Sequence, residues 1–301
     1  MLIAVTGATG FLGRYIANHL LADGHECRCW YRADSDRSGF TVNGKNVQWI
    51  AGDLDDAAAT DHLVDGAGAV VHAALMRPTR QGSGGEGDLV EFAQTNLIGT
   101  LRLMQAARRA NVGRFVFIST CAVHDVILAD RKLDEAHPLW PTSHYGAHKA
   151  ALEAFVHSFG LGEGWPICAV RPTGIYGPAH PIASSKWFDL VRQVLAGKAI
   201  HSGRGGKEVH AADVANAVSI LLHAAPDRVA GQSFNCYDMY IADELVARTA
   251  AQISGSKAAI SNLNRGPKNQ IDTAKIRALG MTFGGSKLLE QTVRQLVDAA
   301  K

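Results

Sequence analysis

Residues 143–150 read SHYGAHKA and hold four side chains that could do chemistry: a tyrosine, a lysine and two histidines. Tyr145 and Lys149 are four positions apart, and so are His144 and His148. In a helix each pair would lie on one face, one turn apart. A lysine ammonium beside a phenol favours the phenolate and so suits proton transfer, whereas two histidines can share a zinc ion. The spacing alone leaves both interpretations open.

Short β-branched apolar runs alternate with longer amphipathic stretches along the first part of the chain. Strands are expected near 2–7, 26–32, 47–53, 69–75, 114–120 and 166–172, and helices near 11–23, 56–65, 88–111 and 144–160. This alternation predicts an α/β fold, a doubly wound parallel sheet of the Rossmann type. A further strand is expected at 232–238 and a terminal helix at 286–300. We predict a Rossmann domain over 1–172, to which 209–240 return, and a smaller interleaved substrate-binding lobe over 173–208 and 241–301.

The composition disfavours several classes of protein. The chain has 301 residues and a net charge of +2 without a basic block, so we expect no nucleic-acid surface. No apolar run approaches the length that crosses a bilayer and the N-terminus lacks a signal-peptide pattern, so we expect no membrane partner and a cytoplasmic protein. The five cysteines are odd in number and lack metal-ligand spacing, which fits reduced thiols better than disulfides or zinc.

A glycine-rich loop directly follows the first expected strand. VTGATGFLG places three glycines where they permit a tight turn, and the helix that follows offers its unpaired N–H groups to a pyrophosphate. We therefore predict a dinucleotide site rather than an ordinary strand-to-helix turn. The predicted cofactor contacts are Gly7, Thr9, Gly10, Phe11, Leu12, Gly13, Arg32, Asp53, Leu54, Ala73, Ala74, Tyr145, Lys149 and Pro172.

Arg32 stands at the end of the second expected strand, where the adenosine ribose of a dinucleotide lies. Because a guanidinium suits the extra phosphate of NADP, we predict NADP as the preferred cofactor, with NAD as the alternative. Asp34 or Asp36 could bind the ribose hydroxyls of NAD, and Arg32 could be an ordinary loop residue. Asp53, after the third strand, is expected either to accept a hydrogen bond from the adenine amino group or to cap a helix.

The chain resembles the extended short-chain dehydrogenase/reductases, including their NAD-dependent epimerase/dehydratase branch. The resemblance rests on TGATGFLG, GDL, HAA, NLIGT, FIST, LDEAHPLWPTSHYGAHK, RPTGIYGP and VHAADVA, which occur in the family's order across most of residues 1–215. It implies Tyr145, Lys149 and Thr120 as the catalytic set, with Ser119 as second choice for the hydroxyl residue and Asn96 in support. Lys149 would also hold the nicotinamide ribose.

A metal site at the two histidines is not expected. The zincin arrangement needs a glutamate directly after the first histidine, and Tyr145 stands there instead. His148 occupies a position where the family often has serine.

The residues after Thr120 bear on the reaction. Sugar-nucleotide dehydratases of the family carry an acidic pair there, whereas this chain has Cys121 and Ala122, so dehydration is not expected. Nucleotide-sugar epimerases usually have an arginine where Gly206 aligns, which leaves Arg204 or Lys207 as substitutes and disfavours a nucleotide-linked substrate. We predict an NAD(P)-dependent oxidoreductase that transfers hydride to or from a secondary alcohol or ketone of a sugar or polyol. The alternatives are a sugar or nucleotide-sugar 4-epimerase with retained NAD, and a non-catalytic NADP-binding sensor.

Two further expectations concern partners. The family often pairs subunits through two long helices, so the resemblance implies a homodimer through the helices at 88–111 and 144–160. The expected ligand is a small molecule, and the glycine-rich stretch at 81–88 fits either a lid over a ligand or a plain connection.

Overall fold

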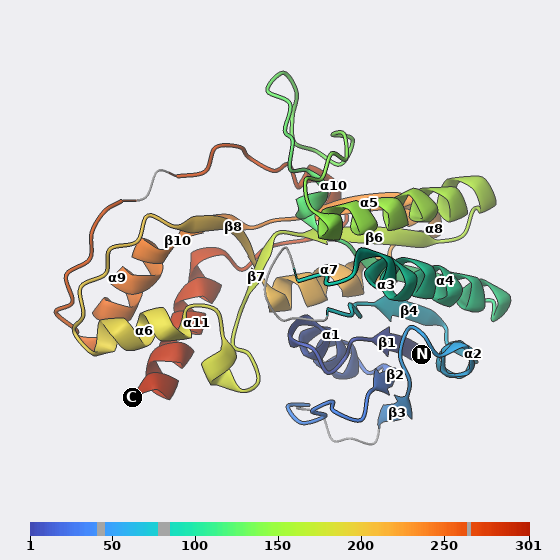
Figure 1. Cartoon of the computed structure of the whole chain (residues 1–301), viewed down its shortest axis with the longest axis horizontal. Coiled ribbons are helices and arrows are strands. Elements are labelled where there is room, and N and C mark those ends of the chain that lie inside the picture. Colours follow the sequence, from blue (N-terminus) through green and yellow to red (C-terminus); the bar gives the residue numbers. More distant parts are fainter. Residues whose placement is uncertain (41–45, 78–84, 264–265) are drawn as a thin grey trace. The chain divides into compact units, whose positions relative to one another are not determined.

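The computed structural model describes residues 1–40, 46–77, 85–263 and 266–301, which form two compact units (Figure 1). The first comprises Met1–Pro172, Ala215–Cys236 and Ile271–Met281, and the second Thr173–Val214, Tyr237–Gln270 and Thr282–Lys301. The stretch that returns to the first unit is thus shorter than 209–240, and a second segment, 271–281, joins it from the region assigned to the substrate lobe. Residues 81–84 of the glycine-rich stretch lie outside the described residues.

A seven-stranded parallel sheet forms the centre of the first unit, and this confirms the predicted α/β class. Its strand order is β3-β2-β1-β4-β5-β6-β9. Each expected strand is present, as β1 (Leu2–Thr6), β2 (Glu26–Tyr31), β3 (Val47–Ala51), β4 (Ala69–His72), β5 (Arg114–Ile118), β6 (Ile167–Pro172) and β9 (Gln232–Cys236). The order of connection reverses between β1 and β4, and in such sheets ligands bind at the carboxyl ends of the strands beside that point.

Helices cover the sheet of the first unit. They are α1 (Phe11–Ala22), α2 (Ala57–Val64), α3 (Leu89–Ala93), α4 (Gly99–Arg109), α5 (His144–His157), α7 (Ala211–His223), which begins in the second unit, α8 (Pro226–Val229) and α10 (Ala274–Arg277). Side chains of α2, α4 and α5 form one core cluster with strand residues such as Phe115 and Phe117. The helix expected over 88–111 contains a π-helical turn, Gln94–Ile98, between α3 and α4. Such turns are frequent at functional sites.

A three-stranded sheet and three helices make up most of the second unit. Strand β8 (Gly205–His210) pairs in parallel with β7 (Gly174–Tyr176) and antiparallel with β10 (Met239–Ala242). Helices α6 (Phe188–Leu195), α9 (Asp243–Ser254) and α11 (Gly285–Ala300) contact one another around a second core (Figure 1). The small sheet was not predicted, because β8 reads GGKEVH and lacks an apolar run.

The described residues contain no helix that is long and apolar enough to cross a membrane. All five cysteines are free thiols, and four of them are buried. Within the same part of the chain, no group of three His, Cys, Asp or Glu side chains could hold a metal ion.

Candidate active site

The loop between β1 and α1 requires glycine at two positions, Gly7 and Gly13. Gly7 has a φ of +73°, and a Cβ added there would lie 2.7 Å from the carbonyl carbon of Ala73. A Cβ at Gly13 would lie 1.9 Å from the carbonyl oxygen of Gly7, so α1 can start this close to the loop only without a side chain. The Gly10 N–H donates to the Gly7 carbonyl oxygen at 3.0 Å and closes the turn.

A cavity of about 280 Å³ opens beside this loop, within the first unit. Eight of the predicted cofactor contacts line it: Gly7, Thr9, Gly10, Arg32, Asp53, Leu54, Ala73 and Ala74. The other six do not line it: Phe11, Leu12 and Gly13 form the first turn of α1, Tyr145 and Lys149 lie on α5, and Pro172 ends β6. A Cβ at Gly7 would collide with the cavity-lining backbone, and the N-terminus of α1 starts at the loop, so these residues fit a dinucleotide pyrophosphate.

The charged side chains after β2 are partly engaged in ion pairs. Arg32 is 56% exposed at the cavity, with its Nε 3.4 Å from a carboxylate oxygen of Asp34. Asp36 instead faces Arg14, at 3.3 Å, and Arg14 also donates to the Ser38 carbonyl oxygen at 3.0 Å. The segment after β2 is therefore pinned to α1, and Arg32 is left at the cavity mouth beside one carboxylate.

Asp53 does not cap the following helix. The Asp56 side chain performs that role by accepting from the Ala59 N–H at 2.9 Å. The Asp53 carboxylate accepts from the Asp55 N–H at 3.0 Å and lines the cavity. The Asp53 carboxylate therefore does not cap the helix and is placed to contact a ligand in the cavity.

A chain of hydrogen bonds that the sequence analysis did not anticipate runs from β1 to the π-helical turn. The Ala74 N–H donates to the Thr6 hydroxyl at 3.1 Å, and Thr6 is 2.7 Å from His72 Nδ1. His72 Nε2 is 2.9 Å from the Thr100 hydroxyl, which donates to the Asn96 carbonyl oxygen at 2.6 Å. Because the Thr100 hydroxyl donates to Asn96, it accepts from His72, so Nε2 of His72 carries a proton. Burial, together with the Lys149 charge, lowers the pKa of His72 to about 3, which keeps the ring neutral.

Asn96 fastens the segment after β4. Its side-chain oxygen accepts from the Met76 N–H at 2.8 Å, and its Nδ2 donates to the carbonyl oxygens of Met76 and Phe92 at 3.0 Å. All of these partners are backbone atoms, and Asn96 is 2% exposed. The side chain thus shapes the loop at the carboxyl end of β4.

The structure brings Tyr145 and Thr120 together. Ser143 caps α5 by accepting from the Gly146 N–H at 3.1 Å. A Cβ at Gly146 would lie 2.6 Å from the carbonyl oxygen of Ala122, so the glycine lets α5 contact the turn that follows Thr120. Tyr145 and Thr120 share a side-chain hydrogen bond. Burial raises the pKa of Tyr145, while this hydrogen bond and the positive charge of Arg77 lower it.

Arg77 was not among the predicted site residues. Its guanidinium carbon lies 4.6 Å from the centre of the Tyr145 ring. No motif contains Arg77, and its position follows only from the fold, which brings the end of β4 beside α5. The sequence predicts Lys149 as the cation that lowers the phenol pKa, whereas Arg77 is the cation that lowers it here.

Lys149 is buried against β5. Its Nζ donates to the Ile118 carbonyl oxygen at 2.7 Å and lies 4.5 Å from the centre of the Phe117 ring. Burial and the charge of Arg77 lower the pKa of Lys149 to about 7, although the carboxylate of Glu153 raises it. A lysine with a pKa near neutrality can hold or release a proton under ordinary conditions.

The two histidines of residues 143–150 lie in different environments. His144 is exposed, whereas His148 is buried with its ring 4.9 Å from that of Phe92. Ser119, the second choice for the hydroxyl residue, points at the buried carboxylate of Glu153 and is 2% exposed. Thr120 is therefore the hydroxyl that faces Tyr145.

A second cavity, of about 700 Å³, lies wholly within the second unit. Lys186 lines it and is 2.5 Å from Glu208, and Arg204 lines it 3.5 Å from Asp243. Trp187, also at its wall, has a left-handed backbone with φ of +69°. Such a conformation is rare for a bulky residue and is often found at functional sites.

Solved structures with the same fold include UDP-glucose 4-epimerase of Thermus thermophilus in complex with NAD. It matches with a TM-score of 0.76 and 23% identity, covering 100% of this chain and 99% of that one. A dTDP-glucose 4,6-dehydratase of Streptomyces venezuelae with NAD bound matches with a TM-score of 0.77 and 24% identity, over 98% and 96% of the two chains.

The sequence relatives are more varied in activity. The dTDP-D-glucose 4,6-dehydratase of Mus musculus is 28% identical over 263 residues, 81% of this chain and 72% of that protein. A quinoline-oxide ketoreductase of Stigmatella aurantiaca is 31% identical over 62% of this chain and 54% of its own. A trifunctional UDP-glucose 4,6-dehydratase, epimerase and reductase of Arabidopsis thaliana is 27% identical, and the chain spans 35% of its length.

The family assignment covers most of the chain. Residues 3–236 match the NAD dependent epimerase/dehydratase family, which includes all the strands of the parallel sheet except the first residue of β1. This agrees with the motifs of the glycine loop and of α5. The chain therefore belongs to the NAD-dependent epimerase/dehydratase family, a group of enzymes of the extended short-chain dehydrogenase/reductase type.

Proposed function

We propose that the protein is an NAD(P)-dependent sugar epimerase that oxidises a secondary hydroxyl and reduces it again on the other face. The observation that carries this proposal is the joint presence of Thr120, Tyr145 and Lys149 at the end of β5 and on α5. The relatives that modify nucleotide sugars support this alternative over the net oxidoreductase that the sequence analysis placed first. An enzymatic family also leaves no support for the non-catalytic sensor.

The proposed mechanism gives each side chain one task. The Thr120 hydroxyl orients the substrate oxygen, and the Tyr145 oxygen takes its proton and later returns it. The cationic groups Lys149 and Arg77 stabilise the Tyr145 phenolate. When bound, the nicotinamide accepts hydride from the carbinol carbon and gives it back. Lys149 would hold the nicotinamide ribose, and Gly7 and Gly10 the pyrophosphate.

The proposed reaction does not include dehydration. Cys121 and Ala122 stand where the dehydratases of the family have their acidic pair. The Cys121 thiol donates to the Arg171 carbonyl oxygen at 3.0 Å, and burial raises its pKa to about 12. A thiol held in this way cannot exchange a proton with a substrate at neutral pH, and the Ala122 side chain has no proton to exchange, so these two positions supply neither the acid nor the base of the dehydratases.

The test is turnover of UDP-glucose and dTDP-glucose by the wild-type, Tyr145→Phe and Thr120→Val enzymes, followed by chromatography of the products. We expect each substitution to lower kcat by at least about a hundredfold, as removal of a general acid–base group does. Thr120→Ser keeps the hydroxyl and serves as the matched control, with activity close to wild type. Full turnover by Tyr145→Phe would exclude the mechanism.

A net oxidoreductase with NADP is the second candidate, because three observations favour it. Arg32 lies at the cavity mouth, and both cations at the cavity of the second unit, Lys186 and Arg204, are already paired with carboxylates. Gly206 also replaces the arginine expected for a nucleotide-linked sugar. An epimerase leaves the absorbance of reduced nicotinamide unchanged at the end of the reaction, whereas a net oxidoreductase changes it in proportion to product.

We also propose a homodimer. Apolar side chains are exposed on or next to the helices expected to pair subunits, with Val90 at 76%, Phe155 at 40% and Leu161 at 68%. Apolar surface of this kind is typical of an interface. Sedimentation velocity of the purified protein measures the oligomeric state directly, and a monomer at every concentration would exclude the proposal.

A further inference from the structure

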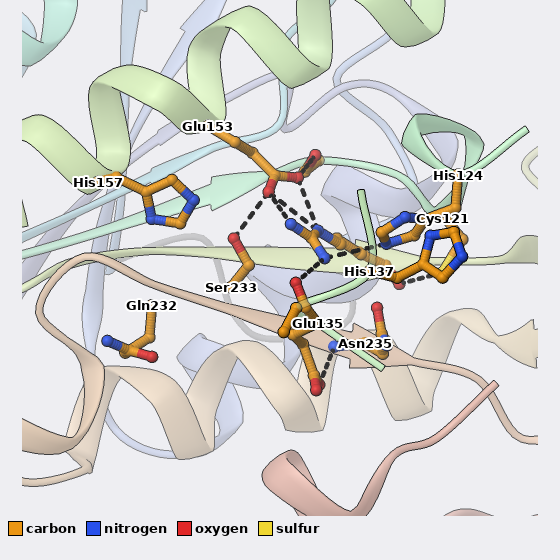
Figure 2. Close-up of polar contacts among 12 residues, drawn as sticks. Cys121, His124, Glu135, His137, Glu153, His157, Gln232, Ser233 and Asn235 are labelled. Carbon is orange, nitrogen blue, oxygen red and sulfur yellow. Dashed lines mark hydrogen bonds and ion pairs between the residues drawn. The ribbon is translucent and has the colours of Figure 1, made fainter. Parts of the chain in front are cut away.

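Glu153 lies on α5, one helical turn after Lys149, and is 0% exposed. Its carboxylate is the centre of a buried polar cluster, which we call the Glu153 cluster and define as Glu153, Arg171, Ser119 and Ser233. Figure 2 shows Glu153 pointing from its helix toward the strands, with Ser233 on one side and His124 beyond. The proposed mechanism uses none of these four side chains.

Every polar atom of the carboxylate is engaged. Oε1 and Oε2 of Glu153 lie 3.0 and 2.9 Å from the Arg171 Nε, and Oε2 also accepts from a terminal nitrogen of Arg171 at 2.5 Å. Ser119 donates to Oε1, and Ser233 donates to Oε2 at 2.7 Å. Although burial acts against the charged form, the charge and hydrogen bonds of Arg171 and of the two serines hold the pKa of Glu153 below its usual value.

The other side of Arg171 is also fixed. Its remaining terminal nitrogen donates to the Glu135 carbonyl oxygen at 3.1 Å and lies 3.0 Å from His124 Nε2 (Figure 2). His124 is neutral, because burial and the Arg171 charge lower its pKa to about 4. The guanidinium therefore cannot turn away from Glu153 without breaking several hydrogen bonds. A buried ion pair of this kind adds little stability, so specificity of geometry is the more direct account of its presence.

The Glu153 cluster joins the strand end that carries Thr120 to the helix that carries Tyr145 and Lys149. Ser119 directly precedes Thr120, and Lys149 Nζ donates to the carbonyl oxygen of Ile118, one residue earlier. These two polar links tie α5 to the end of β5. The link through Lys149 uses a side chain that has a task in the proposed mechanism, whereas the link through Glu153 uses one that has none.

Glu153 also affects the protonation of Lys149. Arg77 from the segment after β4 and the neutral rings of His72 on β4 and His148 on α5 face Lys149 and do not favour its protonated form. Glu153 is the carboxylate that favours it. Tyr145 lies one turn before Lys149 on the same helix.

We propose that Glu153 is a positioning residue of the active site, which holds Thr120 in reach of Tyr145 through Ser119 and favours the protonated form of Lys149. The inference rests on the proposed roles of Thr120, Tyr145 and Lys149. It makes the buried pair part of the proton-transfer machinery rather than a support of the fold alone.

The first experiment compares Ser119→Ala with Ser233→Ala. Each variant removes one hydrogen bond to the same carboxylate from a buried serine, so each should cost similar stability, but only Ser119 is attached to Thr120. The readout is the pKa of Tyr145, taken from the phenolate absorbance that disappears when Tyr145→Phe is added to each variant. We expect Ser119→Ala to raise this pKa and to lower kcat by about tenfold, a typical cost of a misplaced group. Ser233→Ala should change neither.

The second experiment uses Glu153→Gln, which keeps the shape of the side chain and removes its charge. The proton should leave Lys149 at lower pH, so the high-pH limit of activity should fall by about one unit. If this variant fails to fold, the comparison of Ser119→Ala with Ser233→Ala still tests the inference.

Equal effects of Ser119→Ala and Ser233→Ala on the Tyr145 titration, or no effect of Ser119→Ala, would overturn the inference. The titration needs no substrate. It therefore separates failure of the positioning role from failure of the proposed function, which would appear as absence of turnover with an unaltered titration result.

Discussion

Lys149 is buried and Tyr145 is half-buried, and burial acts on their pKa values in opposite directions. It raises that of the phenol and lowers that of the ammonium to about 7, so both side chains are pushed toward their neutral forms. Arg77 adds a positive charge beside both. It favours the phenolate and disfavours the ammonium, so it lowers both pKa values. A lower Tyr145 pKa makes the phenolate a more available base for a substrate hydroxyl.

At the scale of the single residue, Arg32 offers the clearest test of cofactor preference. If its guanidinium binds the adenosine phosphate of NADP, Arg32→Ala should weaken NADPH binding by about 10- to 100-fold, the value of one charged hydrogen-bonded contact. Binding of NADH should stay within about twofold, because the hydroxyls of NAD do not need the cation. Titration of nicotinamide fluorescence measures both.

Arg32→Lys is the matched variant, since it keeps the charge but loses the planar fork of donors. We expect it to recover only part of the NADPH affinity. A wild-type protein that binds NADH more tightly than NADPH would show that Arg32 is an ordinary loop residue, and the carboxylate of Asp34 would then be the ribose ligand to test.

At the scale of the element, the junction of β1 and α1 depends on missing side chains. The 1.9 Å separation between a Cβ at Gly13 and the Gly7 oxygen leaves no room for even one methyl group. We expect Gly13→Ala to lower the free energy of unfolding by about 1–3 kcal/mol, the usual cost of overpacking, and to weaken cofactor binding because the loop must move. Urea denaturation and nicotinamide fluorescence measure the two effects.

Gly162→Ala provides the control for this substitution. A Cβ there meets nothing within 4 Å, and the backbone has no positive φ. Its unfolding free energy should change by less than about 0.5 kcal/mol. Equal stability of the two variants would mean that α1 can shift away from the loop without cost.

The elements near the cofactor cavity were predictable, whereas the buried polar contacts were not. The strands and the glycine loop follow from local patterns, namely apolar runs and glycines in fixed order. Glu153, Arg171 and Ser233 come from three separate elements, and only the fold makes them neighbours. The small sheet of the second unit was missed for another reason, because β7 and β10 are only three and four residues long and β8 is polar and begins with two glycines.

At the scale of the whole molecule, buried histidines set the response to acid. His72 and His148 have pKa values of about 3, and His124 and His210 of about 4, in each case chiefly because of burial. In the unfolded chain each titrates near 6.5 and so binds a proton that the folded chain does not. Stability is therefore fully present above pH 6.5 and is lost as the pH falls from 6.5 toward 4.

We expect the free energy of unfolding to fall over this range by about 1.4 kcal/mol per pH unit for each such histidine. His148→Ser removes one of these titrating groups, so the slope of the unfolding free energy against pH should fall by the contribution of one proton. The substitution breaks no hydrogen bond of His148 Nδ1, since this atom has no partner among the described residues. His144→Ser, at an exposed position one turn away, should leave the slope unchanged. Equal slopes for the two variants would contradict the assignment. Denaturation curves at a series of pH values supply the data.

The π-helical turn Gln94–Ile98 also has an evolutionary consequence. A π turn contains one residue more than an α-helical turn, so an ancestor with an unbroken helix would have been one residue shorter here. Deletion of one residue from this turn would rotate Asn96 by about 100° around the helix axis, the angle between successive residues of an α-helix. The side chain would then leave Met76 and Phe92, and with it the loop after β4 would lose its fastening. Length variation among relatives should therefore spare residues 94–98 even where the flanking helices tolerate it.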